Sequence, residues 1–189
     1  MTTPKDIIFI HVPKTAGSTI YKNFNLTRIE KHTTLNYAQL NYPGHFKKDT
    51  YIMGSVRNPW QRAVSLYNWT KNYITPKHRH NLTWKKWLYQ EDKKMIHDDI
   101  HYVDVLNKDP LKQVNYFINK DGEVQYDEII RCEHLIADVL KSPVLESKPL
   151  RNENVLGTGK DYQGYYDDED IEYIREKSKW EIEEFGYEF

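Results

Sequence analysis

The segment IIFIHVPKTAGST, residues Ile7 to Thr19, joins an apolar run to a turn rich in small and hydroxyl residues. Its first four residues are all apolar, as in the strands of parallel sheets that are buried on both faces. A helix is predicted to begin at Gly17. The order strand, turn, helix predicts that the turn binds an anion, because N–H groups at the start of a helix point outward without partners.

The side chains of the turn favour the same interpretation. Gly17 would let the backbone approach an anion closely, and Lys14 would add a positive charge. The lysine precedes the glycine, whereas in the P-loop GxxxxGK[ST] it follows the second glycine. The predicted anion-binding residues are Lys14, Thr15, Ala16, Gly17, Ser18 and Thr19. The alternative is a plain strand–helix corner whose Thr and Ser residues only cap the helix.

A second segment, GSVRNPWQRAVSLYNW from Gly54 to Trp69, repeats this arrangement. Arg57 follows an apolar strand, and Ser65 lies eight residues later in the predicted helix. The planar guanidinium of arginine suits phosphate, and α/β proteins bind ligands at the carboxyl ends of parallel strands. The two strand ends together predict a ligand with two separated phosphate-like groups.

Strands and helices are predicted to alternate along the chain, which favours one α/β domain over residues 1–189. We expect a central parallel sheet flanked by helices. The predicted strands are Ile7–Val12, Arg28–Thr34, Tyr51–Val56, Lys112–Ile118 and Ile129–Cys132. The predicted helices are Gly17–Phe24, Trp60–Asn72, Glu133–Lys141 and Asp167–Phe185, with a further helix between residues 72 and 94.

Composition limits the classes of function. The formal net charge of −1 over 189 residues offers no general attraction for nucleic acid, so an anion site must be built locally. Cys132 is the single cysteine, which excludes an internal disulfide. No apolar run approaches the roughly 20 residues of a membrane span, and residues 1–6 lack the apolar core of a signal peptide. We therefore expect a cytoplasmic protein.

The two segments together resemble the sulfotransferases that use 3′-phosphoadenosine 5′-phosphosulfate (PAPS), particularly the carbohydrate-type branch. HVPKTAGST is similar to the motif that binds the 5′-phosphosulfate, including its lysine-first order. VRNPWQRAVSLY matches the 3′-phosphate motif R-[DN]-P-x-x-R-x-x-S-x-Y through Arg57, Arg62, Ser65 and Tyr67. The resemblance implies a P-loop-like sulfotransferase fold and PAPS as the sulfuryl donor, with PAP as the product.

The resemblance extends to the end of the chain, except for residues 72–109. RCEHL at 131–135 is similar to an R-x-E-x-L segment of the family, and GTGKDYQGYY at 157–166 is similar to its glycine loop. This loop would fold over the nucleotide, with Lys160 near the 3′-phosphate and Tyr162 beside it. The implied acceptor is a hydroxyl group, expected on a carbohydrate.

Sulfuryl transfer needs a base for the acceptor proton and a cation for the leaving phosphate. Lys14 suits the leaving oxygen. His45, in NYPGHF, is the predicted base, since the family carries a histidine in a similar Gly-His context and an imidazole titrates near neutrality. An exposed loop histidine is the alternative, with Glu133 and His11 as the next candidates. No metal is expected, and HDDIH at 97–101 is a weak zinc match.

Two other functions stay open at the level of sequence. One is a P-loop-type phosphotransferase, which the lysine-first order disfavours. The other is a non-catalytic module that binds PAP or PAPS without turnover.

The helix containing Trp84, Trp87 and Leu88 is expected to pack on the core, with an aromatic platform for a sugar as its alternative. A homodimer could complete the acceptor site.

Overall fold

The computed structural model describes residues 6–24, 26–27, 29–30, 32–73, 82–89, 109–145, 150 and 161–189. The chain forms two compact units: Met1–Arg57 with Gln113–Val155 (unit 1), and Asn58–Lys112 with Leu156–Phe189 (unit 2). A single domain over residues 1–189 stays a prediction, because compact units of this kind occur within domains as well as between them.

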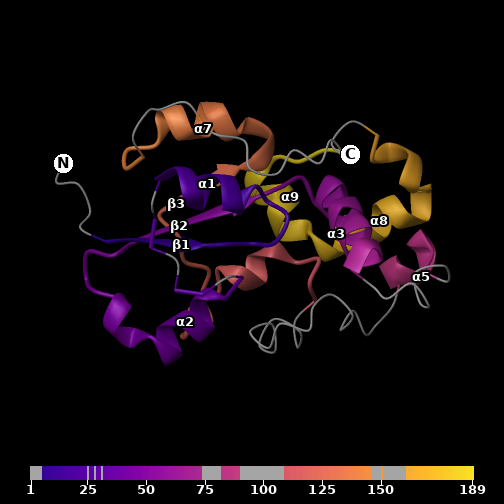
Figure 1. Cartoon of the computed structure of the whole chain (residues 1–189). Coiled ribbons are helices and arrows are strands. Elements are labelled where there is room, and N and C mark those ends of the chain that lie inside the picture. The colour runs from indigo at the N-terminus through magenta and orange to yellow at the C-terminus, as the bar shows by residue number, and fades with distance from the viewer. Residues whose placement is uncertain are drawn as a thin grey trace. The chain divides into compact units, whose positions relative to one another are not determined.

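Unit 1 contains a parallel sheet in the order β1–β2–β3, formed by Ile7–Ile10, Tyr51–Val56 and Glu128–Arg131. Ile7 pairs with Tyr51, and Met53 pairs with Glu128. The α/β class with a parallel sheet is thus confirmed, and β2 has its predicted bounds. All three strands run the same way, so their carboxyl ends lie at one edge of the sheet (Figure 1).

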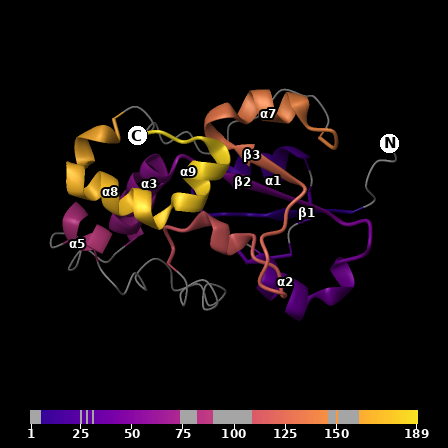
Figure 2. The same ribbon diagram turned by 180° about the vertical axis from the view of Figure 1, so that it is seen from behind.

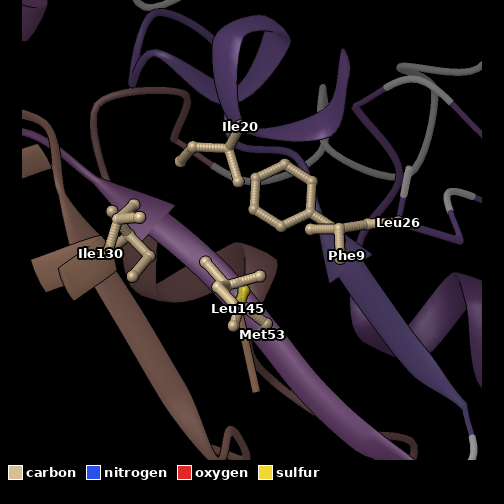
Figure 3. Close-up of a cluster of buried hydrophobic side chains, with 7 residues drawn as sticks. Phe9, Ile20, Leu26, Met53, Ile130 and Leu145 are labelled. Carbon is tan, nitrogen blue, oxygen red and sulfur yellow. The ribbon is translucent and has the colours of Figure 1, made fainter. Parts of the chain in front are cut away.

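The core of unit 1 lies on one face of this sheet. Phe9, Met53 and Ile130 project from the three strands toward helices α1 (Gly17–Phe24) and α7 (Leu135–Lys141), as Figure 3 illustrates. Ile20, Leu26, Val139 and Leu145 complete the cluster. This helical cover fixes α1, and with it the turn that precedes α1, over the end of β1.

The opposite face of the sheet carries α2 (Leu35–Asn41) and the short 3₁₀ helix η4 (Gln113–Tyr116) (Figures 1 and 2). Gly54 faces this side, where an added Cβ would lie 2.2 Å from the Phe117 ring. The glycine in the middle of β2 therefore makes room for an aromatic ring.

Five predicted elements of unit 1 differ from the structure. Strand β1 ends at Ile10 rather than at Val12, and β3 covers Glu128–Arg131 rather than Ile129–Cys132. The described residues of 28–34 form bends and turns, with only Ile8↔Thr27 bridging to β1, and α2 follows them without having been predicted. The Thr34 hydroxyl caps α2 by accepting the Tyr37 N–H. The predicted strand Lys112–Ile118 is instead η4, where the short apolar run packs on the sheet rather than pairing within it. Helix α7 starts after a 3₁₀ turn, η5 (Cys132–His134).

Unit 2 is helical. Helices α3 (Pro59–Tyr73), α5 (Trp84–Tyr89) and α8 (Asp168–Lys177) lie side by side in both views (Figures 1 and 2). The buried Asp170 carboxylate joins two of them by accepting the Trp84 indole N–H at 3.0 Å and the Tyr89 hydroxyl at 2.9 Å. The prediction of α3 is confirmed. The last predicted helix is divided into α8 and α9 (Lys179–Phe185), because Ser178 leaves helical geometry at φ −112° and ψ 30°.

None of the helices in the described part of the chain has the length and apolar character that a membrane crossing requires. Two further short helices, both 3₁₀, occur in the described residues: η1 (Pro43–His45) in unit 1 and η6 (Gln163–Tyr165) in unit 2.

Candidate functional site

Three segments of unit 1 meet at the carboxyl edge of the sheet. The turn from His11 to Ala16 follows β1, Arg57 follows β2, and η5 follows β3. This is the edge at which open α/β sheets bind ligands. The structure therefore brings the two predicted anion-binding segments together on adjacent strand ends, with β2 in the centre.

The backbone of the turn is left-handed at two positions. Lys14 has φ 67° and Ala16 has φ 61°, and only one other non-glycine residue of the described chain, His32, has a positive φ. Residues of alternating handedness direct successive N–H groups toward one point, an arrangement that binds anions. The N–H groups of Thr15, Ala16, Gly17 and Ser18 donate to no acceptor among the described residues. The turn thus offers four successive N–H donors at the start of α1.

Buried side chains hold this strained turn in place. The Thr15 hydroxyl donates to the Val12 carbonyl at 2.8 Å and lies 2.7 Å from the Ser55 hydroxyl on β2. Because the Thr15 proton is directed at Val12, Ser55 is the donor in the second bond. Thr15 and Ser55 are both fully buried. The Thr15 side chain therefore connects the turn to β2 through a hydrogen bond. Because its hydroxyl is used in this way, Thr15 can offer an anion only its main-chain N–H.

Gly17 is required by a neighbouring side chain. A Cβ at this position would lie 2.1 Å from Cδ2 of His11, whose ring is buried over the glycine. His11 in turn stacks on His32 with ring centroids 4.4 Å apart. The space that a Cβ at Gly17 would occupy is thus filled by the imidazole of His11, so the glycine is needed for this ring contact, and its predicted contact with an anion stays a prediction. His11 supports the turn.

The other predicted residues of the turn differ in their exposure to solvent. Lys14, Ala16 and Ser18 are partly exposed, whereas Thr19 is 4% exposed. Lys14 and the Ser18 hydroxyl can therefore reach a bound ligand. Thr19 lies on the buried side of α1.

Arg57 is half-buried, and its main chain is held by Gln113. The Arg57 N–H donates to Oε1 of Gln113 at 2.9 Å, and Nε2 of Gln113 donates to the Arg57 carbonyl at 2.8 Å. Burial raises the pKa of the Cys132 thiol on η5, and the positive charge of Arg57 opposes this rise. The guanidinium charge thus acts at the edge where β2 and β3 end.

An ion pair fixes the end of β3. Asp138 of α7 accepts the Arg131 N–H at 2.9 Å and two guanidinium contacts, at 2.9 Å from Nε and 2.7 Å from Nη2. Burial alone would raise the pKa of Asp138, but the hydrogen bonds and charge of Arg131 outweigh it and lower the pKa. The Arg131 side chain therefore has a structural role, in which it links β3 to α7. Glu133 follows it on η5 and is exposed.

The structure separates His45 from this edge. His45 is exposed on η1 before β2, where its carbonyl accepts the Thr50 hydroxyl and its side chain lines a pocket that also includes Asp6 and Ile8. Asp6 precedes β1, whereas the turn predicted to bind an anion follows it. At about 3.3 Å per residue, the step from Asp6 to His11 spans roughly 16 Å. His45 therefore lies at the amino edge of the sheet, and its predicted role as base has no geometric support.

The remaining predicted residues belong to unit 2 or lie outside the described residues. Ser65 is 8% exposed on α3. Tyr162 is 9% exposed, and its ring packs against Tyr166 and Phe189 at 6.4 and 5.6 Å, which accounts for its burial without a ligand. Lys160 lies outside the described residues.

The motif RNPxxR contains several residues with structural roles. Asn58 caps α3 by accepting the Gln61 N–H at 3.2 Å, and Pro59 occupies the first helical position. Arg62 is 1% exposed and donates to the carbonyls of Pro110 and Leu111 at 3.0 and 3.2 Å. Of the two arginines in the motif, Arg57 is thus the one suited to a ligand.

The aromatic helix α5 packs within unit 2. Trp84 and Trp87 are 9% and 2% exposed, and their rings stack with centroids 5.6 Å apart. The predicted packing role is confirmed, and the alternative of a sugar platform is wrong for these two rings. No group of three or more His, Cys, Asp or Glu side chains in the described chain could hold a metal ion, and HDDIH lies outside it.

Sequence reasoning missed three supporting residues: Ser55, Gln113 and Asp138. A hydroxyl within the apolar strand YIMGSV was a signal for Ser55, since a buried polar side chain needs a partner. Gln113 gave no such signal, because its partner is 56 positions away in the sequence. Comparisons with protein-family models, curated proteins and solved structures give no match to the chain.

Proposed function

We propose that the chain transfers the sulfuryl group of PAPS to an acceptor hydroxyl, on a carbohydrate, within a P-loop-like sulfotransferase fold. The observation that supports this function best is the pairing of two anion-binding elements on adjacent strand ends. One is the N–H nest at Thr15–Ser18 beside Lys14, and the other is Arg57. A ligand with a phosphosulfate and a second phosphate matches both elements.

Each element has a role in this proposal. The N–H groups of the turn and the Lys14 ammonium bind the 5′-phosphosulfate, and Arg57 binds the 3′-phosphate. The roles of Ser65 and Lys160 rest on the motif resemblance alone. Tyr162 takes no part in the proposal, because its ring is packed within unit 2.

In the transfer step, the acceptor oxygen forms a bond to sulfur as the bond from sulfur to the 5′-phosphate oxygen breaks. The electron pair of the broken bond stays on the phosphate oxygen, where Lys14 and the N–H groups stabilise the charge. The acceptor proton passes to a base. We assign this base to Glu133, since it is exposed and follows β3 at the carboxyl edge, whereas His45 lies at the amino edge and His11 is buried.

A second candidate function is a PAP-binding module without turnover. It is favoured by the position of His45, which leaves the anion-binding edge without the histidine that the resemblance implies. The P-loop-type phosphotransferase has no such observation in its favour, and Mg²⁺-dependent ATP turnover would be its signature.

Binding is tested by thermal unfolding with PAP. A ligand present at 100 times its Kd stabilises the native state by about 2.7 kcal/mol. Arg57→Ala should lose most of this shift, and adenosine 5′-phosphate should stabilise the wild type less than PAP does. Lys48→Ala, which removes an exposed cation near the amino edge, is the control and should keep the full shift. A full shift in Arg57→Ala would place the 3′-phosphate elsewhere.

Turnover is tested by single-turnover transfer from PAPS to a panel of glycans, phenols and tyrosyl peptides, read by mass. Glu133→Gln should slow transfer by about 10²–10⁴-fold, the usual contribution of a positioned base, with little change in PAP affinity. His45→Ala is the matched control and should transfer at the wild-type rate. A slow His45→Ala with a normal Glu133→Gln would restore the histidine as the base. PAP binding without transfer to any acceptor would favour the binding module.

A further inference from the structure

The main chain of Arg57 is bound by a side chain from a distant part of the sequence. The chain leaves unit 1 after Arg57 and re-enters it at Gln113. The Gln113 amide accepts the Arg57 N–H at 2.9 Å and donates to the Arg57 carbonyl at 2.8 Å. Gln113 itself is fully buried. The Gln113 side chain therefore links Arg57, where the chain leaves unit 1, to the position at which the chain returns to it.

The hydrogen bonds from Gln113 extend the main-chain bonding of β2 by one residue beyond its pairing with β3. The pairing of β2 with β3 ends at Val56↔Arg131, so Arg57 lies past the ladder. Because Arg57 is half-buried, its N–H and carbonyl need partners in place of a strand. The amide of a glutamine offers an acceptor oxygen and a donor NH₂ group, so it can bond to both main-chain groups of Arg57 as a neighbouring strand would. Gln113 thus keeps Arg57 in line with β2, where its guanidinium projects at the carboxyl edge.

The anion-binding turn is supported by different residues. Thr15 bonds to Ser55 at 2.7 Å, and His11 packs on Gly17. None of these contacts involves Gln113. The supports of the two proposed phosphate sites are therefore separable by mutation.

We propose that Gln113 is the positioning residue for Arg57, and that it sets the preference for a 3′-phosphorylated nucleotide over one with only a 5′-phosphate. The inference rests on the proposed function, in which Arg57 binds the 3′-phosphate. The loss of a hydrogen bond to a charged group costs about 10- to 100-fold in affinity. Loss of the Gln113 hydrogen bonds should therefore weaken the contact to the 3′-phosphate while the contact to the 5′-phosphate persists.

The experiment measures, by calorimetric titration of the full chain, the ratio of the Kd for adenosine 5′-phosphate to the Kd for PAP. Two variants remove the Gln113 hydrogen bonds differently: Gln113→Met keeps the length without hydrogen bonds, and Gln113→Asn keeps the amide but shortens its reach. Both should lower the ratio about 10- to 100-fold, with the Kd for adenosine 5′-phosphate nearly unchanged. If Gln113→Met does not fold, Gln113→Asn decides.

A matched control separates positioning from stability. Asn119 is 9% exposed in the same unit, and its side-chain oxygen accepts the N–H groups of Asp121 and Glu123 at 3.0 and 2.9 Å. Asn119→Ala should lower the Tm but keep the preference for PAP. A wild-type preference retained in the folded Gln113 variants would overturn the inference and leave the proposed function standing. A wild type without any preference for PAP would overturn the role of Arg57 and the inference with it.

Discussion

At the carboxyl edge of the unit 1 sheet, two non-glycine residues adopt positive φ and a buried hydroxyl pair holds the turn, whereas residues 43–50, the described turn at the amino edge, have neither feature. At the amino edge, Gly44 and His45 are exposed and line a pocket of about 190 Å³ with Asp6, Ile8, Thr27 and Lys47. Neither Gly44 nor His45 has a positive φ. The turn at the carboxyl edge is therefore strained and held by buried side chains, whereas the turn at the amino edge has an unstrained backbone.

The difference is informative because strain persists only where surrounding contacts stabilise it, and such strain gathers at functional sites. Lys14 and Ala16 keep left-handed geometry because Thr15 is bonded to Ser55 and Gly17 is packed under His11. A histidine in an exposed turn needs no such support. The predicted role of His45 therefore rests on its residue type and a neighbouring glycine, whereas the predicted role of the turn rests in addition on a strained and supported backbone.

The largest effect is expected from a methyl group added at each edge. Gly17→Ala would place Cβ 2.1 Å from the His11 ring, whereas a Cβ at Gly44 meets nothing within 4 Å. Overpacking of this kind costs about 1–3 kcal/mol, so Gly17→Ala should lower the free energy of unfolding by that amount and weaken PAP binding. Gly44→Ala should be neutral or slightly stabilising. Urea unfolding of both variants checks this, and equal effects would remove the contrast between the edges.

A smaller effect is expected from replacing one lysine at each edge, with glycine in one variant and alanine in another. The variant with the higher stability should be the glycine one at the carboxyl edge and the alanine one at the amino edge. A left-handed conformation costs an L-residue about 1–2 kcal/mol, which glycine avoids. Lys14→Gly should therefore be more stable than Lys14→Ala, since φ at Lys14 is 67°. At Lys48, which lacks a positive φ, the alanine variant should be the more stable. Both Lys14 variants should bind PAP weakly. The same order of stability at both positions would argue against strain at Lys14.

The smallest effect concerns the ion pairs of the two edges and depends on pH. Arg131 lowers the pKa of Asp138, so the charged carboxylate stabilises the fold above the unfolded pKa of about 3.9. This stabilisation is lost as pH falls through the lower folded pKa. The difference in stability between wild type and Asp138→Asn should therefore be constant above about pH 5 and shrink below it.

Asp6→Asn is the matched control at the amino edge. It removes an exposed pair with Lys47, in which Nζ lies 2.8 Å from the carboxylate, and its effect should be smaller than that of Asp138→Asn and fade with added salt. Acid unfolding followed by circular dichroism at two salt concentrations distinguishes the pairs. A pH-independent cost of Asp138→Asn would mean that its hydrogen bonds matter and its charge does not.

Elements with strong local patterns could be predicted. Strand β2 and helix α1 have their predicted bounds, and α3 differs by one residue at each end, since Pro59 precedes its predicted start and Tyr73 follows its predicted end. Helix α2 was missed because its sequence LNYAQLN has a narrow apolar stripe, with Leu35 and Ala38 buried. The apolar run at 112–118 was assigned to a strand because short apolar segments do not distinguish a strand from a buried turn.

The sequence by itself determined the strand–turn–helix order at residues 7–24, the parallel α/β class, and the placement of Lys14 and Arg57 after strands. These follow from local periodicity and from residue chemistry that acts within a few positions. Only the tertiary structure decided that His11 fills the space over Gly17, that Gln113 holds Arg57, and that His45 lies at the other edge. Contacts between residues far apart in the chain depend on how the elements pack, and packing leaves no periodic trace in the sequence.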